Sequence, residues 1–198
     1  EDNAIDIQYN ATTDKKTIIN MTNHSYFNLN GDPSISSMNQ VLYLAADSIT
    51  PVDDTFMTNG TMMAVTGTPF DFNTPKSIDQ DVTNFDNEQI KFGKGFDHNW
   101  VLKTKGDIHQ VAAQLTSPNT GITLEVYTDE PGIQVYTGNF LDGTVKGKKG
   151  IVYPQRASVC LETQHYPDSP NKKHWPSVVL EPGKTYTSHC IFKFGVIK

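Results

Sequence analysis

The sequence is poor in cysteine, in positive charge and in long apolar runs, and each shortage excludes a class of protein. Its two cysteines, Cys160 and Cys190, among 198 residues are too few for the disulfide framework of a small secreted domain. Lys and Arg number 16 against 22 Asp and Glu, a formal net charge of −6, which argues against nucleic acid or an anionic membrane as a partner. No apolar run approaches the length of a membrane span.

These shortages predict a cytoplasmic protein without membrane or nucleic-acid partners. Glycosylation sequons at Asn10, Asn20, Asn23 and Asn59 point towards secretion instead. Asn20 and Asn23, however, lie in a stretch that we expect to line a cleft, where an attached glycan would block folding.

Recognisable cofactor motifs are missing as well. The six His and two Cys show no His-x-His, His-Glu-x-x-His or Cys-x-x-Cys spacing, and there is no Gly-rich phosphate loop. A Gly-x-Ser-x-Gly elbow, which would indicate a serine hydrolase, is also missing. The sequence therefore predicts neither a metal site nor a cofactor.

Short stretches of alternating polar and apolar residues, separated by Gly, Pro and Asn, dominate the chain and predict strands. The expected strands cover residues 5–9, 18–21, 41–45, 62–65, 96–102, 110–117, 121–128, 132–137, 156–164 and 185–196. Residues 49–56 are expected to form a loop or a short extended piece, and the one expected helix lies around Ser77–Phe85. Many short strands at regular spacing are typical of an antiparallel β-sandwich. No repeat or linker divides the chain.

Residues 20–30 are the most informative stretch, because they mix hydrogen-bonding and aromatic side chains. An ordinary core strand would not bury so many polar groups without partners, and a solvated loop has no need of so many aromatics. The mixture predicts a strand whose inner face lines a polar cleft. His24 would be its group that gains or loses a proton near neutral pH, although a single His is more often structural.

Three further polar residues are candidates for the same cleft. Glu162 follows the apolar residues 159–161, where a raised pKa would suit a general base; alternatively, strand alternation points it to solvent. Asp97 either caps a loop or enters the cleft, and His98 should face the other way because adjacent strand residues do. Gln134, by pattern alone, is an outward polar residue of a strand.

Several of these segments resemble motifs of the aldose 1-epimerases (galactose mutarotases). Residues 22–29, Thr-Asn-His-Ser-Tyr-Phe-Asn-Leu, are similar to one signature of the family, and Leu-Glu-Thr-Gln at 161–164, before Pro-Asp-Ser-Pro-Asn, to a second. Residues 97–100 and 131–139 resemble two more, and residues 68–72 a fifth. The resemblance covers the whole chain, 1–198, but only the C-terminal portion of an epimerase domain. It implies an all-β antiparallel sandwich of the galactose mutarotase-like (supersandwich) type, N-terminally incomplete.

The resemblance also implies site residues and a substrate. Glu162 would be the catalytic base and His24 the acid, while Asp97 and Gln134 would bind sugar hydroxyls. The substrate would be a small-molecule aldose such as galactose or glucose, and no cofactor would be required.

An aromatic side chain, Tyr26 or Phe72, is expected to stack on the apolar face of the sugar. Epimerases of this family carry a further His and an Asn–Arg pair ahead of the region matched here. The chain on its own is therefore expected to have little activity, to expose unpaired strand edges, and to need a complementing N-terminal fragment.

Three other functions remain open. A non-catalytic carbohydrate-binding module would use the same polar cleft and aromatic residues. A glycosidase would use two carboxylates, Asp97 and Glu162. An epimerase acting on sugar phosphates is disfavoured, because Arg156 is the only Arg in the chain and no basic cluster lies near the motifs.

Overall fold

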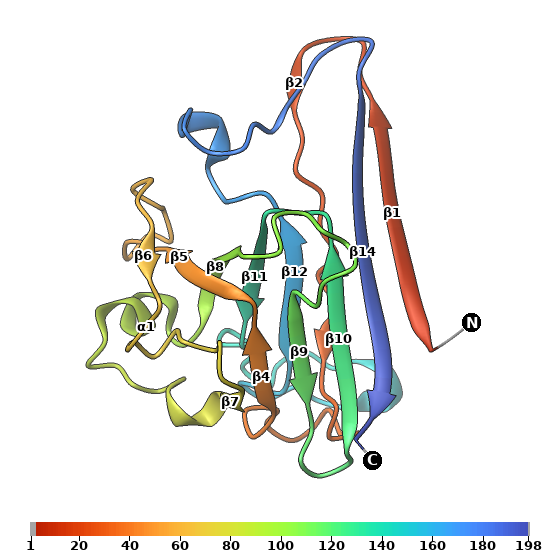
Figure 1. The fold of residues 1–198 in the computed structure, drawn as a ribbon. Coiled ribbons are helices and arrows are strands. Elements are labelled where there is room, and N and C mark those ends of the chain that lie inside the picture. Colours follow the sequence, from red (N-terminus) through yellow and green to blue (C-terminus); the bar gives the residue numbers. More distant parts are fainter. Residues whose placement is uncertain (1–2, 198) are drawn as a thin grey trace.

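Two six-stranded antiparallel sheets make up most of the computed structural model, which describes residues 3–197 (Figure 1). The first sheet has the order β1 (Ala4–Thr12), β14 (Thr185–Val196), β10 (Ile122–Thr128), β9 (Ala113–Thr116), β4 (Val41–Leu44) and β7 (Lys76–Ser77). The second has the order β3 (Tyr26–Phe27), β12 (Val159–Gln164), β11 (Gly132–Tyr136), β8 (Asp97–Leu102), β5 (Ala46–Thr50) and β6 (Met63–Ala64). A separate pair joins β2 (Thr17–Ile18) to β13 (Val179–Leu180).

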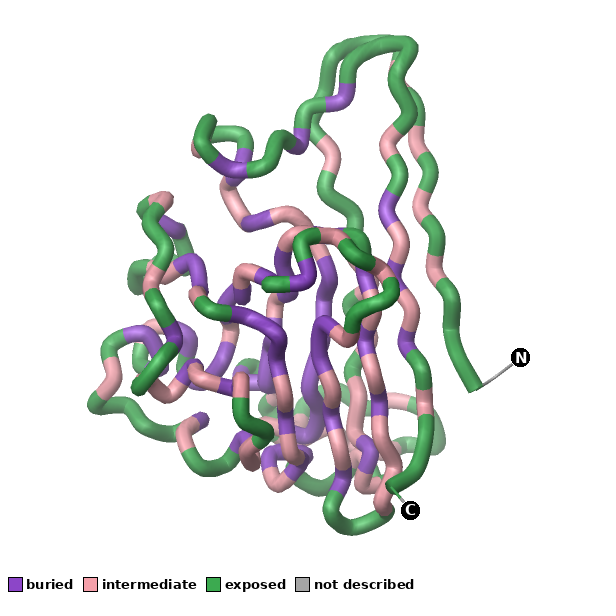
Figure 2. Tube along the Cα trace, in the orientation of Figure 1, coloured by how far each residue is buried: buried purple, intermediate pink, exposed green. Residues whose placement is uncertain are grey.

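The core fills the space between the two sheets. Phe27 of β3 packs on Phe192 of β14, with ring centroids 5.0 Å apart, and so links one sheet to the other. Trp100 of β8 is fully buried beside Phe70 and Phe96. Figure 2 shows the buried residues running along the central strands of both sheets. The antiparallel sandwich expected from the sequence is confirmed.

A projecting arm extends beyond this core. At the top of Figure 1, β1, β14 and β2 reach past the other strands. Every residue of β1 is exposed or half-buried, because this strand has a neighbour on one side only.

Helical structure is confined to short pieces in the described residues: α1 (Glu88–Gly93) and the 3₁₀ turns η1 (Ile78–Gln80), η2 (Lys148–Gly150) and η3 (Ser169–Asn171). None of these helices is long and apolar enough to cross a membrane. The Asn87 side chain caps α1 by accepting hydrogen bonds from the backbone N–H groups of Gln89 and Ile90, as Asn does at helix starts.

Three sequence-based expectations about elements are wrong. The helix expected at Ser77–Phe85 is only the turn η1, because the residues after it form successive turns, with Asn84 N–H bonded to Asp81 and Phe85 N–H to Thr83. The single α-helix begins later, at Glu88. Residues 46–50 form strand β5, of which the expected elements include only residues 49 and 50, as the start of the loop or short extended piece at 49–56.

The third error concerns residues 18–25. Strand β2 ends at Ile18 and strand β3 begins at Tyr26, so His24 lies in a non-strand segment between them. The hydrogen-bonding side chains there compete with regular pairing: Asn23 Oδ1, for example, accepts a bond from the backbone N–H of Ser25 at 3.1 Å.

Candidate active site

Four neighbouring strands, β8, β11, β12 and β3, form the floor of the candidate site. Residues directly opposite one another in antiparallel strands present their side chains on the same face. The register therefore places two adjacent cross-strand rows on the outer face of the sheet: Asn99, Gln134 and Glu162 in one, and Asp97, Tyr136, Cys160 and Tyr26 in the other. The residues between them in sequence, such as Val135 and Leu161, are fully buried and face the core.

His24 completes the site from the segment that precedes β3. Its Nε2 atom lies 3.3 Å from Oε1 of Glu162. The imidazole stacks on the ring of Tyr26, with centroids 4.9 Å apart. The His24 side chain is 49% exposed and that of Glu162 only 9%. The pair therefore joins a solvent-accessible imidazole to a carboxylate on the floor of the site.

Asp97 and Gln134 form a second pair beside the first. Gln134 Nε2 donates a hydrogen bond to Asp97 Oδ1 at 2.8 Å. Both pairs line one cavity of about 430 Å³, whose walls are His24, Tyr26, Asp97, Gln134, Tyr136, Phe140, Glu162, Gln164 and Pro167. The structure thus brings together all four residues that the sequence singled out.

A larger hollow of about 690 Å³ adjoins this cavity at Tyr26. It is lined by Tyr26, Asn28, Gly31, Pro33, Leu141, Val145, Tyr153, Ala157 and Ser158. No carboxylate or imidazole is among these residues, whereas the smaller cavity is lined by His24, Asp97 and Glu162.

Burial raises the pKa of both carboxyl groups of the cavity, Glu162 and Asp97. Desolvation raises the pKa of Glu162 to about 7; the nearby His24 lowers it and the Asp97 charge raises it. Desolvation also raises the pKa of Asp97, against the opposing effects of the Gln134 hydrogen bond and His24. A carboxyl group with a pKa near neutrality can act as a general base at physiological pH.

His98 lies on the opposite face of β8, as strand alternation predicted. It is fully buried, and its ring contacts Phe70 with centroids 4.8 Å apart. Burial lowers the pKa of His98 to about 3, so it is neutral. It takes no part in the cavity.

Of the two aromatic residues expected to stack on the sugar, the structure excludes one. Phe72 is 1% exposed and packs against Phe96 and Trp100 in the core, so it cannot reach a sugar. Tyr26, in contrast, is 52% exposed and lines the cavity.

Four cavity residues were not expected from the sequence: Tyr136, Phe140, Gln164 and Pro167. A signal existed for two of them, because Tyr136 and Gln164 lie two positions after Gln134 and Glu162 and so share their faces. Phe140 comes from a loop, where no periodicity indicates direction.

The Thr137-Gly138-Asn139 part of the family-like motif has a structural role. Asn139 Nδ2 donates to the carbonyl oxygens of Gly93 and Phe96 at 2.9 and 3.0 Å. Thr137 Oγ1 accepts from the N–H of Phe96 at 3.1 Å. Gly95 has φ +136°, and a Cβ there would lie 2.4 Å from Asn139 Oδ1. These contacts fix the loop that leads into β8, whose first residue is Asp97.

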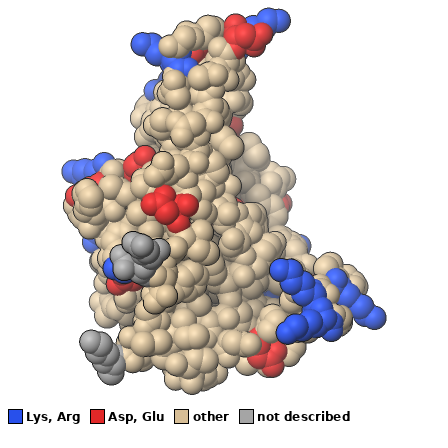
Figure 3. Space-filling model, turned by 90° about the vertical axis from the view of Figure 1, so that its right-hand side faces the viewer, with Lys and Arg blue, Asp and Glu red and all other residues tan. Residues whose placement is uncertain are grey.

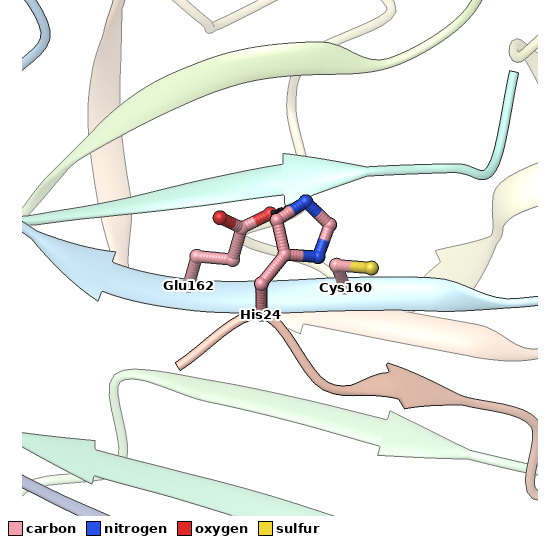
Figure 4. Close-up of side chains that lie close together, drawn as sticks. All are labelled: His24, Cys160 and Glu162. Atoms are coloured by element: carbon pink, nitrogen blue, oxygen red, sulfur yellow. Dashed lines mark ion pairs between the residues drawn. The ribbon is translucent and has the colours of Figure 1, made fainter. Parts of the chain in front are cut away.

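Cys160 lies beside His24, on the strand that also carries Glu162, as Figure 4 shows. One ligand atom each of His24, Cys160 and Glu162 can be chosen so that all lie within 4.8 Å of one another. Burial raises the pKa of the Cys160 thiol, so the group is protonated and does not serve as a nucleophile. The other free cysteine, Cys190, is buried in strand β14.

Comparison with known proteins identifies relatives of the whole described region. The model of the Aldose 1-epimerase family matches residues 1–193. Galactose mutarotase of Mus musculus is 43% identical over 190 residues, which are 96% of this chain and 54% of that protein. Aldose 1-epimerase of Escherichia coli (strain K12) is 40% identical over 196 residues, 98% of this chain and 56% of that protein.

Solved structures agree. The galactose 1-epimerase of Lactobacillus acidophilus NCFM superposes with a TM-score of 0.83 at 32% identity, covering 100% of this chain and 55% of that one. An aldose epimerase homologue from C. elegans gives a TM-score of 0.88 at 30% identity, covering 100% of this chain and 57% of that one. The chain spans about half the length of the curated relatives that it matches.

Proposed function

Because this chain belongs to the aldose 1-epimerase family, we propose that it carries the acid–base pair and part of the sugar pocket of an enzyme that interconverts the α and β anomers of hexoses. Galactose and glucose are the proposed substrates; galactose appears in the names of several relatives. The observation that carries the proposal is the 3.3 Å approach of His24 Nε2 to Glu162 Oε1 at the floor of a polar cavity.

In the proposed reaction, Glu162 and His24 move two protons in opposite directions. The Glu162 carboxylate takes the proton from the hydroxyl on C1 while protonated His24 gives a proton to the ring oxygen. The bond between C1 and the ring oxygen breaks, and C1 becomes an aldehyde. Rotation about the C1–C2 bond followed by ring closure on the other face returns both protons. The cycle is balanced and consumes no co-reactant.

The starting state requires ionised Glu162 beside protonated His24. Because the pKa of Glu162 is raised to about 7, a proton moves to and from this carboxylate with little free-energy cost at neutral pH. We expect the rate to rise as pH increases through about 7, where Glu162 ionises.

Asp97 and Gln134 are proposed to hold the sugar hydroxyls. Gln134 already donates to Asp97, while its Oε1 is buried without a hydrogen-bond partner among the described residues. A hydroxyl of the sugar can donate to that oxygen or to the second carboxylate oxygen of Asp97. Tyr26 is proposed to stack on the apolar face of the ring.

The isolated chain is proposed to be a weak catalyst. The relatives extend well beyond the matched region, and an error of 1 Å in positioning costs about a hundredfold in rate. An N-terminal half supplied as a second fragment should restore the rate.

Polarimetry of freshly dissolved α-D-galactose and α-D-glucose tests the proposal. We would compare this chain alone with this chain mixed with the N-terminal half of the Escherichia coli relative. In the more active sample, Glu162→Gln and His24→Asn should each lower the catalysed rate by a factor of about 10² to 10⁴. Near-full activity of Glu162→Gln would disprove the assignment of the base. Sugar binding without catalysis in every sample would favour a carbohydrate-binding module instead.

A further inference from the structure

Three side chains with metal-binding atoms meet at the floor of the cavity. Cys160 and Glu162 are two positions apart on β12, so they share one face of the strand, and His24 lies over them from a segment far away in the sequence (Figure 4). No spacing motif predicts this set, because its members come together only through the fold. The three can each offer a ligand atom within 4.8 Å of the other two.

We propose that His24, Cys160 and Glu162 form a binding site for a thiophilic divalent cation such as Zn²⁺, and that the bound cation blocks the acid–base pair. Thiolate, imidazole and carboxylate are the three ligand types that Zn²⁺ takes in proteins. The cation is an inhibitor in this proposal and has no place in the reaction.

The distances suit a tetrahedral ion. With metal–nitrogen and metal–oxygen bonds of about 2.0–2.1 Å, two ligand atoms of a tetrahedral zinc site lie about 3.3 Å apart. His24 Nε2 and Glu162 Oε1 already have this separation, at 3.3 Å. A zinc–sulfur bond of about 2.3 Å requires the three ligand atoms, now within 4.8 Å of one another, to move closer together, and the half-exposed imidazole can shift to allow this.

Binding must release protons. Zn²⁺ coordinates the thiolate and the neutral imidazole, so the thiol proton of Cys160 and any proton on His24 go to solvent. The affinity should therefore increase with pH. Coordination by neutral His24 removes the protonated acid, and coordination by the Glu162 carboxylate occupies the base. A bound ion would therefore stop proton transfer.

Cobalt binding tests the site without any measurement of activity. Co²⁺ is added to the reduced chain, and absorbance is scanned for the charge-transfer band that only a cobalt–thiolate bond produces. Cys190→Ala is the matched control, because Cys190 is the other buried cysteine and lies on the other sheet. We expect the band in the wild type and in Cys190→Ala and not in Cys160→Ala. Competition with Zn²⁺ should remove it.

A second variant guards against misfolding of Cys160→Ala. His24 is largely at the surface, so His24→Ala should fold, which far-UV circular dichroism checks, and should bind Co²⁺ at least tenfold more weakly. Absence of the band in the wild type, or its survival in folded Cys160→Ala, overturns the proposal. Unchanged affinity of His24→Ala overturns it as well.

The inhibition rests on the proposed function, whereas the binding does not. In a sample that catalyses mutarotation, Zn²⁺ should slow the wild type and Cys190→Ala and leave Cys160→Ala at least tenfold less sensitive. A cobalt–thiolate band in a protein without mutarotase activity would support the metal site and refute only the catalytic role. Equal Zn²⁺ sensitivity of both cysteine variants would contradict the blocking mechanism.

Discussion

At the scale of single residues, Glu162 couples stability to pH. Burial raises its pKa to about 7 in the folded protein, against about 4.3 in an unfolded chain. The folded state thus binds this proton more tightly. The resulting stabilisation is fully present below about pH 4 and is lost as pH rises through about 7.

Glu162→Gln should remove this dependence, because the amide does not ionise. Relative to the wild type, its free energy of unfolding should rise between about pH 4 and pH 7, by roughly 2–3 kcal/mol. Urea denaturation of both proteins at several pH values measures the difference. A difference that stayed constant with pH would show that Glu162 titrates normally.

Asp97 should affect substrate binding more than chemistry. Its carboxylate holds Gln134 at 2.8 Å and has a second oxygen available for a sugar hydroxyl. Hydrogen bonds to a charged group contribute about 1.5–3 kcal/mol, so Asp97→Asn should raise KM for galactose about tenfold or more while kcat falls by less. Polarimetric rates over a range of galactose concentrations separate the two. A loss confined to kcat would place Asp97 in the chemical step instead.

The sequence predicted most individual site residues but not all their surroundings. Strand alternation correctly separated Asp97 from His98. The motif resemblance brought His24 and Glu162 to one place, although they are far apart in the chain. Phe72 was misassigned because the sequence around a Phe does not show whether its side chain lies in the core or in a cleft. The packing of Phe72 against Trp100 in the folded structure places it in the core.

At the scale of elements, Asn20 joins the segment that carries the proposed acid, His24, to the segment that carries the proposed base, Glu162. Its Oδ1 accepts from the N–H of His165 at 3.0 Å, and its Nδ2 donates to the His165 carbonyl at 2.9 Å. His24 lies four residues after Asn20, and Glu162 lies three residues before His165. The buried Glu130 carboxylate pairs with His165 Nδ1 at 2.5 Å and holds this corner in place.

Asn20→Ala should therefore loosen the acid relative to the base. We expect kcat to fall about ten- to a hundredfold, with KM changed little, and the free energy of unfolding to fall by about 1–2 kcal/mol. Asn59→Ala is the matched control, because among the described residues the Asn59 side chain bonds only to Thr61 in its own turn. Similar steady-state kinetics for the two variants would show that the Asn20 contacts do not position the pair.

Strands were more predictable than the other elements for a physical reason. A two-residue period is visible wherever one face of a strand is buried, and β14 was expected with its observed bounds, Thr185–Val196. The six-residue helix α1 depends on its Asn87 cap and on Lys94 in the left-handed region at φ 57°, and so short a helix has almost no periodicity to detect.

At the scale of the whole molecule, the two six-stranded sheets have four edge strands among the described residues, and three of these strands are short. The edge strands β3, β6 and β7 have two residues each, whereas β1 has nine. A long edge presents unpaired N–H and C=O groups to other chains, and natural proteins protect such edges with Lys, Pro or bulges. Strand β1 contains neither Lys nor Pro, and its only charged residue, Asp6, is paired with His189 at 2.9 Å.

The side of the molecule on which β1 lies is also sparsely charged. Figure 3, which views the molecule from that side, shows a mostly uncharged surface, with charged side chains at the upper end, along the left edge and at the lower right, and an acidic group near the middle. Ile5 of β1 is 52% exposed and borders a hollow of about 770 Å³ together with Phe194 and Val196. This combination of free backbone groups and apolar surface favours pairing between copies of the chain.

We therefore expect the chain to associate through β1 as its concentration rises, and Ile5→Lys to suppress this association. A lysine at the edge adds charge that a second copy would have to bury, whereas the folded monomer keeps it in water and should lose little stability. Phe85→Lys is the control, since Phe85 is 48% exposed but lies in a turn outside the strands. Sedimentation velocity over a range of concentrations compares the three proteins. If Phe85→Lys reduced association as much as Ile5→Lys, general charge repulsion would be the cause, and β1 would not be the site of contact.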